Sequence, residues 1–171
     1  MKIRFVLFIA LIAYLFIGCT HNEENAIEID EEEEIKIPTM PPDLSLITSH
    51  TSVPLTRYGY CWNENDCSLS PQNPKDVLVD QRPLRVTSGE TLTFDTATSL
   101  SYKGQVIKPN IIEVTHIYKG NETKIDVSDK RLVAPEDKGT HYFNVYAKWE
   151  EEIDGEEVTG EAYHAFKLIS E

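Results

Sequence analysis

One alternating segment constrains this chain more than any other feature. From Gly139 to Trp149 apolar and polar residues alternate along most of the segment. One set of alternate positions holds Phe143, Val145, Ala147 and Trp149, and the other holds Tyr142, Asn144, Tyr146 and Lys148. Because successive side chains of an extended strand point to opposite faces, the pattern predicts a strand with one buried face. Asp154-Gly155 is a hairpin turn signal, so the chain is expected to return as an antiparallel strand over 162–169.

The rest of the region 44–171 has the same character. It contains no convincing helical stripe, and extended segments recur between turn signals. We expect these strands at 55–63, 84–87, 91–96, 111–118, 123–127 and 131–134. Seven or eight short strands separated by turns are typical of a β-sandwich. The predicted fold class is therefore all-β, an antiparallel β-sandwich in one domain over residues 44–171.

The entry into the long strand resembles a known pattern. The residues that carry the resemblance are Pro135, Gly139, Phe143 and Val145. They are similar to the start of the penultimate strand of immunoglobulin-like domains, where a Tyr two residues after the Gly bonds back to the corner. Here that position holds His141. The resemblance covers roughly residues 50–170 and implies an immunoglobulin-like sandwich.

The first 18 residues have the features of an export signal. Lys2 and Arg4 precede an apolar run of 13 residues, Phe5 to Ile17. A membrane-spanning helix needs about 20 apolar residues, so this run has the length of a signal-peptide core. An uncleaved membrane helix, or a secreted protein cut elsewhere, are the alternatives.

The residues that end this run resemble the lipobox of bacterial lipoproteins. They are Phe16-Ile17-Gly18-Cys19, with Phe16 where Leu is usual. The resemblance implies cleavage after Gly18 and a lipid on Cys19. Two acyl chains are enough for stable anchoring. We therefore expect the chain to be held by Cys19 on the extracytoplasmic face of a cell membrane, with the membrane as its first partner.

Residues 19–43 are expected to form a disordered tether. Glu31 to Glu34 is a run of like charges, and Pro38, Pro41 and Pro42 follow it. Such a segment has too few apolar groups to offset the entropy lost on ordering. It is interpreted as a solvated spacer, with a cation-binding segment as the alternative.

The charge of the chain excludes one class of partner. The net charge is −13, and removal of residues 1–18 with Lys2 and Arg4 makes it −15. A strongly acidic protein is repelled by phosphate backbones, so no nucleic acid partner is expected.

Two cysteines remain in the predicted domain, Cys61 and Cys67. Outside the cytoplasm a disulfide between them is expected to persist. Two reduced thiols, or half of a metal site, are the alternatives, although no second cysteine pair completes four zinc ligands. The segment Tyr60-Cys61-Trp62-Asn63, with Cys67 after it, resembles small uncharacterised surface lipoproteins of Gram-positive bacilli. That family implies no activity.

No catalytic motif occurs in the sequence. It lacks a nucleophile elbow, a zinc-protease helix, a phosphate-binding glycine loop and a calcium loop. His141 and His164 fall on neighbouring strands, where they could bind a metal, sense pH or simply be half-buried polar residues. We expect no enzyme activity, no cofactor and no metal.

Several residues are candidates for contact with a partner. At a period of two, Tyr58, Tyr60 and Trp62 share one face, either as an exposed aromatic ladder or as part of the core. Asn65 and Asp66 lie in the cysteine loop, and Asp154 lies in the acidic turn. The expected function is a non-catalytic binding module for an unknown protein or envelope partner. The alternative is a protease-inhibitor-like or stress-protective lipoprotein, acting through the loop 61–67.

Overall fold

A computed structural model describes residues 38–64, 66–96, 101–102 and 104–171. The predicted signal peptide, Cys19, the tether as far as residue 37, and Asn65 lie outside the described residues. The chain divides into two units, and Ile35–Glu171 form the one described here. No helix among the described residues has the length and apolar character needed to cross a membrane.

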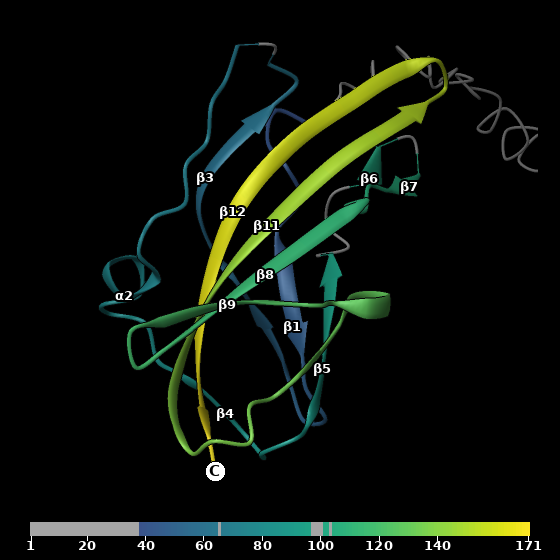
Figure 1. The fold of residues 1–171 in the computed structure, drawn as a ribbon. Coiled ribbons are helices and arrows are strands. Elements are labelled where there is room, and N and C mark those ends of the chain that lie inside the picture. The colour runs from purple at the N-terminus through teal and green to yellow at the C-terminus, as the bar shows by residue number, and fades with distance from the viewer. Residues whose placement is uncertain (1–37, 65, 97–100, 103) are drawn as a thin grey trace, which may run out of the picture. The chain divides into compact units, whose positions relative to one another are not determined.

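Most of this unit is β-strand, arranged in two sheets (Figure 1). The larger sheet has the order β3-β12-β11-β8-β9, and β4 pairs in parallel with the end of β12. Its strands are β3 (Thr56–Trp62), β4 (Leu84–Val86), β8 (Ile111–Tyr118), β9 (Asn121–Ile125), β11 (Gly139–Ile153) and β12 (Glu156–Ser170). Apart from the β4 pairing, all of its neighbours are antiparallel.

The smaller sheet has the order β10-β5-β1-β2 and is antiparallel throughout. Its strands are β1 (Leu44–Ile47), β2 (Ser52–Pro54), β5 (Thr91–Thr96) and β10 (Arg131–Val133). The remaining elements are the short pair β6 (Ser101–Tyr102) and β7 (Gln105–Val106), α2 (Pro74–Val77) and the 3-10 turn η1 (Ser128–Lys130).

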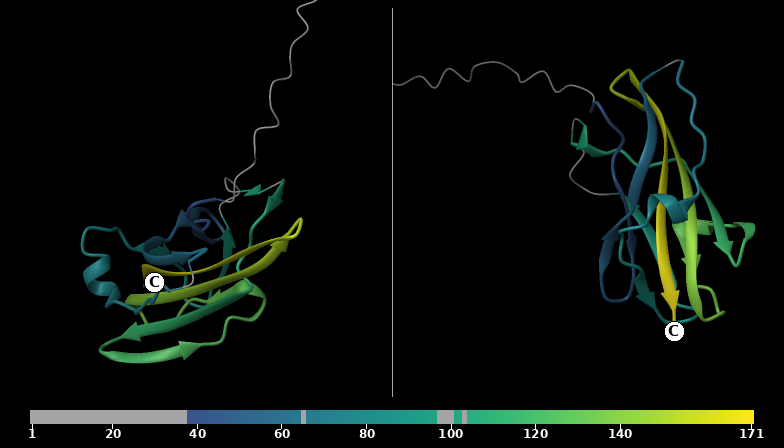
Figure 2. Two further views of the ribbon diagram at one scale, coloured as in Figure 1. Left: turned by 90° about the horizontal axis from the view of Figure 1, so that it is seen from above. Right: turned by 90° about the vertical axis from the view of Figure 1, so that its left-hand side faces the viewer.

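The two sheets pack face to face as two layers (Figure 2). From the smaller sheet, the buried side chains are Leu44, Leu46, Leu92, Phe94 and Leu132. From the larger sheet, they include Val114, Phe143, Val145, Ala147, Trp149, Phe166 and Leu168. Phe94 meets Phe166 edge-on across the layers, with ring centroids 6.3 Å apart. Each fully buried large apolar side chain stabilises the fold by about 1.5–3 kcal/mol. The predicted antiparallel β-sandwich is confirmed.

Three strands in each sheet follow the order seen in the immunoglobulin-like class. In that class strands A, B and E lie together in one sheet, and C, F and G in the other. Here β1, β5 and β10 occupy the first set of places, and β8, β11 and β12 occupy the second. The prediction drawn from Pro135, Gly139 and the alternating strand therefore agrees with the observed topology.

His141 forms the corner bond that the class usually forms with a tyrosine. It is fully buried at the start of β11, and its Nε2 lies 2.7 Å from the carbonyl oxygen of Asp137. Because a carbonyl can only accept, Nε2 carries the proton and donates. Its Nδ1 lies 2.9 Å from Nε2 of His116. The ring of Tyr118 stacks on His141 at 4.1 Å.

The predicted approach of His141 to His164 is wrong. His141 lies opposite Leu168, and His164 lies opposite Val145. Along β12, Leu168 and His164 are four residues apart, which is about 13 Å in a strand. The two-residue turn Asp154-Gly155 fixes this register, because it pairs Ile153 with Glu156.

The folded unit also begins earlier than residue 44. Pro41 and Pro42 are buried. The Arg57 guanidinium lies 2.6 Å from the carbonyl oxygen of Pro41 and 2.9 Å from the carboxylate of Asp43. Residues 38–43 of the predicted tether therefore pack on the sandwich. Composition does not show that a backbone carbonyl of this stretch accepts a hydrogen bond from a side chain of the sandwich. For this reason the disordered tether was predicted to continue to residue 43.

Candidate binding site

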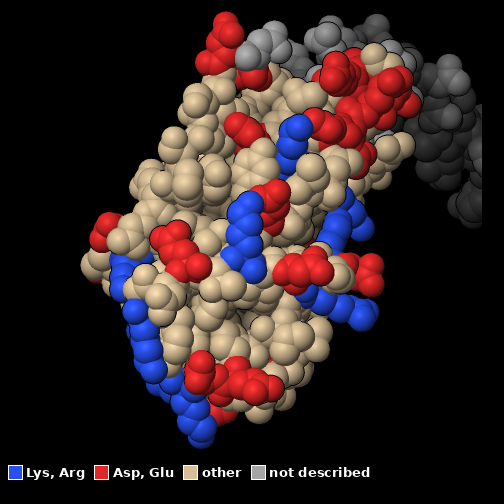
Figure 3. Space-filling view, viewed as in Figure 1, with Lys and Arg blue, Asp and Glu red and all other residues tan. Residues whose placement is uncertain are grey.

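The outer face of the larger sheet carries a concave, tyrosine-lined surface. On β11, the side chains that point away from the core belong to even-numbered residues. On β8 and in the middle of β12, they belong to odd-numbered residues. The same face, formed by β12, β11, β8 and β9, is seen in Figures 1 and 3. It holds a pocket of about 200 Å³, which we call the tyrosine pocket. The pocket is lined by Pro71, Glu113, Thr115, Glu122, Lys124, Asn144, Tyr146 and Tyr163.

Strand register explains how residues distant in sequence meet in this pocket. Tyr146 lies between Tyr163 on one side and Glu113 on the other. One step along, Asn144 lies beside Thr115, which in turn lies beside Lys124. Large side chains therefore surround the shorter side chains of Thr115 and Asn144. This difference in length leaves a hollow above the two shorter residues.

Aromatic contacts and hydrogen bonds hold the pocket wall in place. Tyr163 packs between Tyr58 and Tyr146, with ring centroids 5.9 Å and 5.3 Å away. The Tyr58 hydroxyl donates to Oδ1 of Asn144 at 3.1 Å and accepts from the backbone N–H of Gln72 at 3.3 Å. The Asn144 amide donates to the carbonyl of Gln72 at 2.9 Å. The loop that brings Pro71 to the rim is therefore fastened to β3 and β11.

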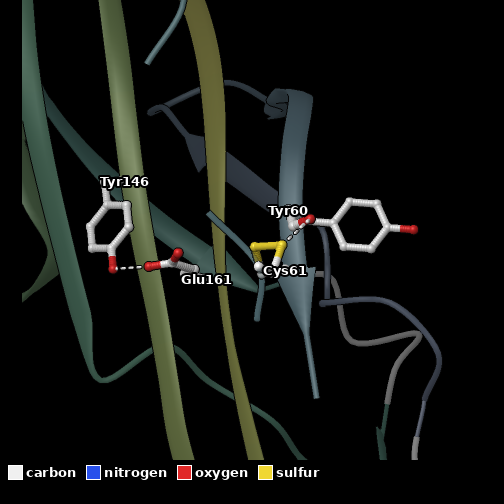
Figure 4. Close-up of a disulfide and its surroundings, with 5 residues drawn as sticks. Tyr60, Cys61, Tyr146 and Glu161 are labelled. Carbon is white, nitrogen blue, oxygen red and sulfur yellow. Dashed lines mark hydrogen bonds between the residues drawn. A yellow bond between two sulfur atoms is a disulfide. The ribbon is translucent and has the colours of Figure 1, made fainter. Parts of the chain in front are cut away.

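The pocket has a negative electrostatic character. The Tyr146 hydroxyl donates to Oε2 of Glu161 at 2.5 Å (Figure 4). Burial raises the pKa of Tyr146 well above its ordinary value, and the Glu161 carboxylate adds to the shift. Burial, and then the carboxylates of Glu161 and Glu113, also raise the pKa of Tyr163. Both hydroxyls therefore stay protonated at physiological pH.

A lysine lies at the pocket rim. Lys124 is 3.4 Å from Glu113, and its side chain is 82% exposed. An exposed pair of this kind is worth about 0–1 kcal/mol. Lys124 can therefore leave Glu113 at little cost.

A disulfide stabilises the strand next to this face. Cys61 and Cys67 are bonded, with their Cα atoms 5.8 Å apart. Figure 4 shows the bridge between Tyr60 and the Tyr146–Glu161 pair. The loop it closes is fastened to β12 by two hydrogen bonds. The backbone N–H of Asn63 donates to the carbonyl of Thr159 at 2.8 Å, and the backbone N–H of Thr159 donates to Oδ1 of Asn63 at 3.1 Å. The predicted disulfide fits this structure.

Removing the disulfide tests its contribution. The variant Cys61→Ser/Cys67→Ser is expected to lose about 2.4 kcal/mol of unfolding free energy, the chain-entropy value for a seven-residue loop. Urea unfolding of the full chain measures this loss. Wild-type protein with reductant should unfold at the variant's midpoint. A variant as stable as the oxidised wild type would contradict the expectation.

The three predicted aromatic residues of β3 do not share one face. The pairing of β3 with β12 shifts register between Tyr163 and His164, which leaves Tyr58 as an extra residue on the face opposite to Tyr60 and Trp62. Trp62 is only 4% exposed and meets Trp149 edge-on, whereas Tyr58 lies on the outer face against Tyr163. Tyr60 is 43% exposed, and its ring points away from Tyr146 in Figure 4. The prediction that all three share one face is wrong because this bulge moves Tyr58 to the opposite face, while Tyr60 and Trp62 keep the period of two.

The other predicted contact residues do not join the tyrosine pocket. Asp66 is exposed in the disulfide loop. Asp154 occupies the β11–β12 turn with a left-handed backbone, φ 52°. Acidic residues gather at this tip (Figure 3), around an open hollow lined by Glu150, Glu151, Glu152, Gly155 and Glu157. Among the described residues no three metal-ligating side chains come together.

Sequence reasoning missed most of the pocket. Of the predicted binding residues that the structure describes, only Tyr58 contacts it, through Tyr163 and Asn144. The available signal was the polar face of the alternating strand, which already placed Tyr142, Asn144 and Tyr146 together. No family model matches the chain, and neither a curated protein nor a solved structure matches it.

Proposed function

We propose that this protein is a lipid-anchored, extracytoplasmic binding module that contacts an envelope partner through the tyrosine pocket and catalyses no reaction. The observation that carries the proposal is the pocket itself, a preformed hollow between Tyr146, Tyr163 and Glu113 on an open sheet face. The leader sequence that ends at Cys19 supports the location.

The rigidity of the pocket favours binding. Tyrosine is enriched at recognition surfaces because its ring offers a large contact area and its hydroxyl a hydrogen bond. Association also costs free energy for every side chain that it immobilises. Here Tyr58 and Asn144 are already held by Gln72, and Tyr146 by Glu161, so little of that cost remains.

The chemistry of the pocket favours binding over catalysis. General acid–base catalysis needs a group whose pKa lies near the working pH. The pKa of Tyr146 and the pKa of Tyr163 are both shifted upward, away from that range.

Photo-crosslinking in intact cells tests location and binding together. The full chain would carry benzoylphenylalanine in place of Lys124 at the pocket rim. The matched control carries it in place of Val133, which is 60% exposed on β10 of the other sheet. We expect a discrete membrane-bound adduct from position 124 and none from position 133. Mass spectrometry of the adduct should find an acylated Cys19 at the N-terminus, and Cys19→Ser should abolish both acylation and adduct. Identical adducts from positions 124 and 133, or an intact Met1, would refute the proposal.

A further inference from the structure

The tyrosine rings of this protein differ in what covers them. Three of the rings have a cation of the same chain above them. Arg57 lies 5.2 Å from the Tyr60 centroid, Lys75 lies 5.6 Å from that of Tyr142, and Lys119 lies 4.7 Å from that of Tyr118. Among the described residues, no Lys or Arg lies over Tyr146 or Tyr163. Carboxylates adjoin these two rings instead.

Arg57 shows how this protein holds a guanidinium. The group lies over the Tyr60 ring, bonds to the Asp43 carboxylate at 2.9 Å and donates to the carbonyl of Pro41. An aromatic face and a carboxylate together suit a guanidinium, which is planar, weakly hydrated and able to donate in a fork. The tyrosine pocket offers the same two groups, in Tyr146 and Tyr163 with Glu113 and Glu122, and it is open to solvent.

We infer that the tyrosine pocket takes the arginine side chain of a basic peptide segment from a partner protein. The inference rests on the proposed function and names the occupant of the same site. The planar guanidinium would stack on the pocket tyrosines while its N–H groups donate to Glu113 and Glu122. Lys124, now paired with Glu113, would swing outward into water. Charge complementarity extends beyond the pocket, because the chain carries a net charge of −13.

This arrangement predicts opposite effects for two substitutions on one rim. Glu113→Gln removes an acceptor for the guanidinium, so it should weaken binding. Lys124→Gln removes the competing cation, so it should strengthen binding. General attraction to an acidic surface would also change with these two charges, so a control far from the pocket is needed. Glu152→Gln at the acidic tip changes the net charge by the same amount as Glu113→Gln.

The test is a titration of the lipidated full chain in a non-ionic detergent, followed by NMR of the probe. The probe is a nine-residue Gly/Ser peptide with one central arginine, and the comparison peptides carry lysine or citrulline there. We expect saturable binding of the arginine peptide, about fivefold weaker binding of the lysine peptide and none of the citrulline peptide. Relative to wild type, Glu113→Gln should weaken the affinity about fivefold, Lys124→Gln should strengthen it about twofold, and Glu152→Gln should leave it unchanged.

Three outcomes would overturn the inference. Equal weakening by Glu113→Gln and Glu152→Gln would mean general attraction to a negative surface. Equal affinity for the arginine and lysine peptides would remove the guanidinium as the recognised group. A crosslinked partner at position 124 combined with no saturable peptide binding would reject the arginine occupant while leaving the proposed function standing. Unchanged thermal midpoints of the variants would show that none of these results comes from unfolding.

Discussion

Between pH 6.5 and pH 4 the protein is expected to lose about 3 kcal/mol of unfolding free energy through one side chain, His164. This residue is fully buried in β12, and neither ring nitrogen has a hydrogen-bond partner among the described residues. Burial lowers the pKa of His164 from 6.5 to about 3, and the positive charge of Arg57 contributes to the shift. The charged ring is therefore strongly disfavoured in the folded state.

The direction of the effect follows from proton linkage. Below pH 6.5 the unfolded chain binds a proton at His164, whereas the folded chain binds one there only when the pH nears 3. Stability therefore falls as the pH drops through this window, by about 1.4 kcal/mol per pH unit once the unfolded state is fully protonated. Above pH 6.5 both states hold the neutral ring, and the contribution disappears.

His164→Leu should remove this pH dependence. Urea unfolding of the full chain at pH 7.5, 6, 5 and 4 measures it. The variant should also be about 1–3 kcal/mol more stable at pH 7.5, because two buried polar atoms without partners are removed. His50→Leu, on the exposed β1–β2 turn, is the matched control and should follow the wild-type slope. Equal slopes for His164→Leu and wild type would show that other groups cause the acid sensitivity.

The sequence predicted the parts of the fold that depend on local pattern. The expected strands at 91–96 and 111–118 coincide with β5 and β8. Alternation in β11 assigned each side chain to the correct face, since Phe143 and Val145 are buried while Tyr142 and Tyr146 lie outside. These features follow from neighbouring residues alone.

The register of the β11–β12 hairpin could also have been predicted from the sequence. The Asp154-Gly155 turn pairs Ile153 with Glu156, and counting back from there pairs His141 with Leu168. Treating two strands as adjacent, without this count, produced the mistaken pairing of His141 with His164. The short strands β1 and β2 gave no comparable pattern, because each has only a few residues.

The pocket could not be predicted because its geometry is long-range. It requires β8, β11 and β12 to lie side by side in a fixed register, and it requires Gln72 to bond across to Asn144. The bulge that separates Tyr58 from Trp62 is likewise a property of the pairing with β12. Sequence alternation reports the faces of one strand and cannot report which strand lies beside it.

Gly160→Ala is expected to cost about 3 kcal/mol, because Trp62 occupies the space that a Cβ atom needs. Gly160 lies between Trp62 on β3 and Trp149 on β11. A Cβ there would overlap Cε3 of Trp62 and lie 2.8 Å from its Cζ3. The indole cannot shift freely, since its N–H donates to the carbonyl of Pro38 at 2.6 Å and its ring meets Trp149 edge-on.

Two comparisons separate this steric effect from the general cost of altering a strand glycine. Gly59→Ala, on the neighbouring strand, places its Cβ 3.6 Å from Leu69, an ordinary contact, and should change the stability by less than about 1 kcal/mol. In a Trp62→Leu background the ring is gone, so Gly160→Ala should cost much less there than in wild type. Urea unfolding followed by tryptophan fluorescence measures the wild type and all four variants. If Gly160→Ala costs the same with and without Trp62, packing of the indole on Gly160 is not what requires a glycine at this position.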